Sequence, residues 1–167
     1  MLSNFIKKLL FARQFYMNDG NIEVMKIKQV MLSSAVIHEL NSPMVYNAVK
    51  ENIRKEFHEI ANNFGSERTD LLKSVEDIFE VYGLGKLEIS KIDENGKSAS
   101  LNLFNSSIAH AHNSKNLNSD APVCFLTSAV IAGIFSFLFD DDVNCTEKRC
   151  FGKGDEYCEF VVKRGGR

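Results

Sequence analysis

The residues best suited to chemistry gather in the C-terminal third of the sequence, which holds every cysteine of the chain: Cys124, Cys145, Cys150 and Cys158. Three of these cysteines fall within 14 residues, together with Glu147. Zinc prefers thiolates and other soft or borderline ligands and takes four of them in a tetrahedral site. Four cysteines in 167 residues are too few for a disulfide scaffold, so their clustering favours a metal site.

Residue spacing brings the candidate ligands together but leaves two ligand sets open. Two strands are expected on either side of a glycine-rich turn at 152–154, so Cys150 and Cys158 would flank that turn. Cys145 and Glu147 are two residues apart on one strand and therefore share a face. The site is either four cysteines or three cysteines with Glu147. The alternative to both is that these are ordinary buried cysteines.

Two histidines and one kinase-like motif offer weaker signals. His110 and His112 could reach a pocket or bind a metal, but their polar neighbours predict that both are exposed. The stretch 38–43 (HELNSP) is similar to the phosphoacceptor box of sensor kinases, yet the sequence contains no ATP-binding motif, and a stand-alone phosphoacceptor is the alternative. A serine at position 42 also excludes the HExxH zinc motif. We expect a helix end here, followed by a helix that begins at Ser42-Pro43.

Hydrophobic periodicity predicts the elements that position these residues. Strands are expected at 14–17, 21–28, 87–89, 99–104, 143–149 and 157–163, and helices at 30–40, 43–64, 67–82 and 122–139. The pairs Asp19-Gly20 and Asn95-Gly96 are typical of two-residue hairpin turns, so paired strands should be antiparallel. The predicted fold class is α+β: an antiparallel sheet built from hairpins, with helices packed on one face.

The stretch 121–139 carries no charge over 19 residues, nearly enough to span a bilayer. Asp120 precedes it, three aspartates follow it, and small polar residues interrupt it, so we expect a buried core helix rather than a membrane span. Small side chains recur on this helix every four residues, at Cys124, Ser128, Ala132 and Ser136. Such a ridge permits either close packing or a cavity above it.

The N-terminal residues 1–13 form an amphipathic segment, because Leu2, Phe5, Ile6 and Leu9 would share one helical face. We expect this segment to dock on the domain or on a partner subunit; an interfacial membrane anchor is the alternative. It lacks the apolar core of a secretory signal, so a cytoplasmic location is expected. A net charge of −2 disfavours nucleic acid as a partner.

The pattern Pro122-Val123-Cys124, Glu147-x-x-Cys150 and Gly154-x-x-x-Cys158-x-Phe160 resembles the 4-vinyl reductase domain family. That family is similar in fold to the TRAPP vesicle-tethering subunits and includes the sensing domains of aromatic-responsive bacterial activators. The resemblance implies that residues 14–167 are one such domain. It also implies a zinc ion held by Cys124, Glu147, Cys150 and Cys158, which favours Glu147 over Cys145. Three thiolates and one carboxylate saturate zinc, so the ion would be structural rather than catalytic.

The same resemblance implies a small hydrophobic ligand between the apolar helix and the sheet, with a pocket lined by Phe104, Ser128, Cys145 and Phe160. Sensing members of the family carry larger aromatic or phenolic groups at several such positions, so specificity for phenols does not transfer. The expected function is a zinc-stabilised sensor or scaffold domain that acts as a homodimer. Two alternatives stay open: reduction of a vinyl group on a tetrapyrrole-like substrate, for which the sequence shows no nicotinamide-binding motif, and a ligand-free assembly adaptor.

Overall fold

The main sheet contains four antiparallel strands in the order β4-β5-β7-β6. A computed structural model describes residues 15–64, 68–72, 74–115 and 119–165. The four strands are β4 (Lys86–Asp93), β5 (Ser98–Phe104), β6 (Val143–Arg149) and β7 (Cys158–Arg164). Only one face is covered, because side chains on β5 and β6 alternate between buried and more exposed positions. The fold class is α+β, as predicted.

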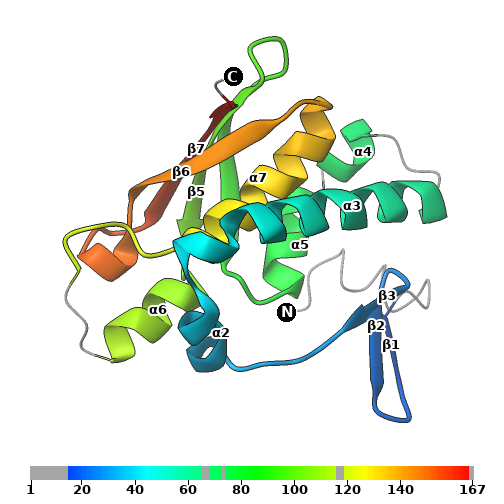
Figure 1. The fold of residues 1–167 in the computed structure, drawn as a ribbon, viewed down its shortest axis with the longest axis horizontal. Coiled ribbons are helices and arrows are strands. Elements are labelled where there is room, and N and C mark those ends of the chain that lie inside the picture. The colour runs from blue at the N-terminus through cyan, green and yellow to red at the C-terminus, as the bar shows by residue number, and fades with distance from the viewer. Residues whose placement is uncertain (1–14, 65–67, 73, 116–118, 166–167) are drawn as a thin grey trace.

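Helix α7 (Phe125–Phe139) is the centre of the fold and is buried on nearly all sides. It lies against the inner face of the sheet, and α3 (Tyr46–Phe64) packs on it from outside (Figure 1). The two helices approach closely at Gly133, where a Cβ atom would lie 2.6 Å from the carbonyl oxygen of Lys50. Within the described ranges, the structure contains no helix that is long and apolar enough to span a membrane.

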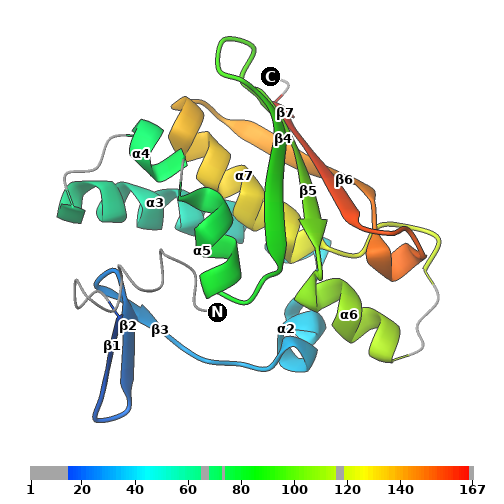
Figure 2. The same cartoon turned by 180° about the vertical axis from the view of Figure 1, so that it is seen from behind.

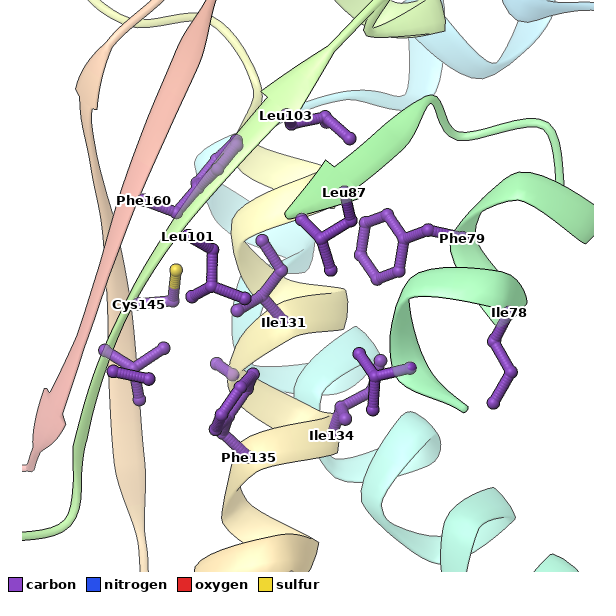
Figure 3. Close-up of a cluster of buried hydrophobic side chains, with 14 of the residues drawn as sticks. Ile78, Phe79, Leu87, Leu101, Leu103, Ile131, Ile134, Phe135, Cys145 and Phe160 are labelled. Atoms are coloured by element: carbon purple, nitrogen blue, oxygen red, sulfur yellow. The ribbon is translucent and has the colours of Figure 1, made fainter. Parts of the chain in front are cut away.

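The space between the sheet and α7 is filled with side chains rather than open. Figure 3 shows Leu101 and Phe160 of the sheet facing Ile131 and Phe135 of α7. All four are completely buried, and the core continues along α5 (Val75–Val81). The predicted helix at 67–82 is therefore two helices, α4 (Arg68–Leu72) and α5.

The N-terminal strands do not join the main sheet. They are β1 (Phe15–Asn18), β2 (Asn21–Val24) and β3 (Ile27–Gln29), and they form a separate three-stranded antiparallel sheet that projects beside the helical layer (Figure 2). The sequence predicts one long strand at 21–28, but a two-residue turn at Met25-Lys26 divides it, with φ of 51° and 64°. That turn was missed because neither residue is typical of a turn that needs positive φ. Residues 1–13, predicted to be amphipathic, lie outside the described residues.

Short helices complete the chain around the end of the main sheet. The predicted helix at 30–40 begins only at Ser34, because the Ser33 side chain accepts a hydrogen bond from the Val36 amide and caps α2 (Ser34–Leu40). The chain then forms η1 (Pro43–Val45), α6 (Ser107–Ser114) and η2 (Phe151–Lys153). Helix α6 was not predicted; Ser106 caps it by accepting a hydrogen bond from the Ala109 amide.

Candidate metal centre

Cys124 immediately precedes α7, and the side chain of Asn41 fixes the backbone on both sides of it. The Asn41 amide donates to the carbonyl of Val123, and its oxygen accepts a hydrogen bond of 2.8 Å from the Leu126 amide. Asn41 thus satisfies one of the amides that the first turn of a helix leaves without an intrahelical partner. The thiol of Cys124 is also placed at the positive end of the α7 dipole, which favours a thiolate there.

Irregular backbone after β6 directs the other ligands toward Cys124. The register of β6 against β7 shifts between Glu147 and Arg149, a β-bulge that re-aims the side chains following it. The Cys150 amide then donates to a carboxylate oxygen of Asp155 over 2.8 Å, which tightens the turn. Across this turn, the Phe151 amide donates to Cys158 Sγ over 3.4 Å.

The four predicted ligands come together as one buried group: Cys124, Glu147, Cys150 and Cys158. Their ligand atoms all lie within 4.8 Å of one another. Cys124 Sγ lies 3.9 Å from the sulfur atoms of both Cys150 and Cys158. A tetrahedral zinc site with Zn–S bonds of about 2.3 Å places its sulfur atoms about 3.8 Å apart, so the observed spacing fits a metal ion.

The carboxylate of Glu147 provides a second test of the fit. One oxygen accepts a hydrogen bond of 2.9 Å from the Cys124 amide. The other oxygen, Oε1, is buried and has no hydrogen-bond partner among the described residues. A buried acceptor without a partner is costly, and a bound cation would satisfy it.

Without a cation, this group holds protons rather than four negative charges. Burial raises the pKa of Glu147 to about 7. Hydrogen bonding to Cys150 raises the pKa of Cys124, whereas hydrogen bonds from Cys124 and Cys158 lower the pKa of Cys150. A divalent cation would displace these protons, because zinc ligands bind in their deprotonated forms.

Cys145 lies outside this group, although it shares the inner face of β6 with Glu147. Its thiol belongs to the apolar core, and burial raises its pKa well above the ordinary range. Its backbone is held by Tyr46 of α3: the Cys145 amide donates to the phenol oxygen over 2.7 Å, and the phenol donates to the Cys145 carbonyl over 3.1 Å. The tyrosine therefore occupies backbone groups on the outer edge of β6.

The residues predicted to line a ligand pocket are not gathered in one place. Ser128, Cys145 and Phe160 are buried in the interior. Phe104 lies on the other face of the sheet, because buried residues alternate with it along β5, and its ring contacts Tyr157 at 5.3 Å between centroids. No described cavity joins the four, and their role in ligand binding stays a prediction.

A large apolar cavity instead lies on the opposite side of α7, with a volume of about 430 Å³. From α7 it is lined by Leu126, Val130 and Ile134. These residues are offset by two positions, or about 200° around the helix, from the ridge of small residues at 124, 128, 132 and 136. The other walls come from β2, β3, the segment 30–32, α3 and α5.

The two histidines of α6 differ in their surroundings. His110 is exposed, as predicted, and its ring lies 4.7 Å from that of Phe151. The prediction for His112 was wrong: its side chain is buried, because α6 turns it toward α2, where its Nδ1 lies 3.2 Å from His38 Nε2. The stretch 38–43 thus has a structural role, since it supplies both His38 and the Asn41 contacts. Burial, reinforced by nearby Lys115, lowers the pKa of His38.

The fold and this site define a class of small α+β domains with a cysteine-rich metal centre. Residues 107–164 match the 4-vinyl reductase domain family, so this part of the chain belongs to that family, as the cysteine and glutamate spacing predicted. The chain is 35% identical over 97 residues to the uncharacterised protein MJ0150 of Methanocaldococcus jannaschii. That match covers 58% of this chain and 53% of the relative, so the chain spans about half the length of that relative.

Solved structures with this fold include ligand-bound domains. The phenol-responsive sensory domain of the transcription activator PoxR, solved with phenol, has a TM-score of 0.72 at 18% identity and covers 97% of this chain and 91% of its own. A vinyl-4-reductase family protein of Methanocaldococcus jannaschii has a TM-score of 0.54 at 17% identity, with 99% and 98% covered. A trafficking protein particle complex subunit 3 of Naegleria fowleri, covalently bound to palmitic acid, has a TM-score of 0.50 at 16% identity, with 81% and 84% covered.

Proposed function

We propose that this chain is a zinc-stabilised sensor or scaffold domain that binds a small hydrophobic molecule and acts as a homodimer. The observation that carries the proposal is the closed group of three thiols and one carboxylate at the start of α7. Four protein ligands leave no open coordination position for a reactive water, so the ion would be structural. It would tie the N-terminus of α7 to the turn between β6 and β7 and so hold the interior in one arrangement.

Binding of a small molecule is supported by two further observations. The structure contains an apolar cavity of about 430 Å³, within the 300–1,000 Å³ range that is usual for ligand pockets. The fold is also that of domains solved with phenol and with palmitic acid. These similarities concern the fold, and the ligand of this chain is a question for experiment.

A homodimer is supported by apolar side chains that the described residues leave uncovered. Val30, Met31, Leu40 and Met44 are more than half exposed, reaching 93% at Met44, and all lie on or beside α2. Exposed apolar side chains that gather in one region mark surfaces for association. Sedimentation equilibrium at micromolar concentration tests this part of the proposal; a monomer at every concentration would contradict it.

The experiment that tests the central proposal combines metal analysis with a ligand screen. Protein purified without added metal should contain about one zinc ion per chain, and a chelator that removes the ion should lower the melting temperature. Calorimetric titration with small apolar molecules should then show binding at one site per chain. Protein that contains no zinc would contradict the metal centre, and protein that binds no apolar molecule would contradict the sensor function.

A further inference from the structure

The cavity beside α7 is apolar except for one group of polar side chains. Among the described residues that line it, Glu56 of α3 is the only one with a formal charge. The remaining lining residues are hydrophobic except for Gln29 and Tyr82. Pockets of this composition bind a ligand by its apolar body and orient it through the few polar groups.

The three polar side chains lie close together at one end of the small sheet and α5. The Gln29 amide donates to the phenol oxygen of Tyr82 over 3.3 Å. Burial, and then the neighbouring Glu56 carboxylate, raises the pKa of Tyr82 to about 12. Burial also raises the pKa of Glu56, with Glu59 contributing a like charge. The region therefore has a negative potential that its own side chains do not neutralise.

Glu56 has no ion-pair partner among the described residues. The ion pairs within the described ranges join other groups, at the ends of the main sheet and between α2 and α6. The described cavity lining contains no lysine, arginine or histidine. A half-buried carboxylate beside apolar walls is poorly solvated, and a cation placed next to it would be stabilised.

We propose that this cavity binds an amphiphilic organic cation, with a hydrocarbon or aromatic body in the apolar part and an ammonium group at the Glu56 carboxylate. This inference rests on the proposed function in ligand binding and names the ligand class. The ammonium group would form a charge-assisted hydrogen bond with Glu56. The ring of Tyr82, which also lines the cavity, can add a cation–π contact.

The experiment compares three probes that differ only in their head group: decylamine, decanol and decanoate. Each is titrated by calorimetry into the full chain, below its micelle concentration and at neutral pH. We expect decylamine to bind about tenfold more tightly than decanol, the ratio that a single charge-assisted hydrogen bond supplies, and decanoate to bind most weakly. In Glu56→Gln the preference for the amine should fall to within about twofold of the alcohol.

Two variants separate this site from surface binding. Glu51→Gln changes the net charge equally on an exposed position of the same helix and should keep the preference for the amine. Val130→Trp fills the cavity from α7 and should weaken all three probes. Equal binding of all three probes, or an amine preference that survives Glu56→Gln, would overturn the ligand class but leave the binding function standing. Failure of every probe to bind would overturn both.

Discussion

Replacing Cys150 with serine, beside the matched change Cys145→Ser, tests which thiols hold the metal. Both thiols are buried and lie near one another in the chain, but only Cys150 belongs to the four-ligand group. Metal binding contributes about 10–16 kcal/mol of apparent folding free energy in zinc-finger peptides, or about 3 kcal/mol for each of four ligands. In a domain of this size that loss lowers the melting temperature by about 6–12 °C.

The two variants should differ most clearly in their response to a chelator. Cys150→Ser should lose its zinc, melt near the temperature of chelated wild-type protein and show no further change when chelator is added. Cys145→Ser buries a hydroxyl in the apolar core, which costs about 1–3 kcal/mol, but should keep one zinc ion and the full chelator-induced shift. The assays are elemental analysis and thermal denaturation with and without chelator. Zinc retained in Cys150→Ser, or lost in Cys145→Ser, would refute the ligand assignment.

Three further changes test the contacts that position the centre and its supporting helices. Asn41→Ala should destabilise the chain by about 1–3 kcal/mol, because amides and carbonyls at the start of α7 lose their partner, whereas the exposed Asn62→Ala should have little effect in the same denaturant titration. Gly133→Ala should cost about 1–3 kcal/mol by forcing α3 and α7 apart, despite the better helix propensity of alanine; a stabilised variant would show that the helices can separate freely. Tyr46→Phe should lower the unfolding free energy by about 1–2 kcal/mol because the edge of β6 loses its hydroxyl partner, and an equal loss in the exposed Tyr16→Phe would contradict that explanation.

The metal centre could be predicted from the sequence because its information is local and chemical. Cysteine is rare here, and the interval from Glu147 to Cys158 spans one bulge and one tight turn. The supporting contact from Asn41 could not be predicted, since it joins residues 85 positions apart and resembles an ordinary helix boundary in the sequence. His112 was misjudged for the same reason: its sequence neighbours are polar, but its neighbour in space is His38.

The separate N-terminal sheet illustrates a different limit of sequence patterns. The Asp19-Gly20 turn was recognisable because both residues tolerate positive φ, and the structure gives them 49° and 78°. The Met25-Lys26 turn carries no such signal. Its strain is offset by tertiary packing, since the Met25 side chain is only 6% exposed and lines the cavity. Local propensity cannot reveal a turn that is held by contacts made elsewhere in the fold.

Helix α7 shows why side-chain size alone did not reveal which of its faces borders the cavity. The ridge of small residues at 124, 128, 132 and 136 suggested room for a cavity, but small side chains equally let another element approach. On that side Ser136 hydrogen-bonds to both the amide and the carbonyl of Val143, so β6 lies directly against the helix. The cavity lies instead beside the larger side chains of Leu126, Val130 and Ile134, where the partner elements are a small sheet and a connecting segment.

The metal centre and the cavity are connected through this one helix. Cys124 precedes the first turn of α7, and Leu126, which lines the cavity, donates its amide to the same asparagine that holds the backbone beside Cys124. An ion at the four-ligand site would therefore fix the helix end from which the cavity wall begins. A structural metal in this position stabilises the fold and also sets the position of a binding surface, without any part in a reaction.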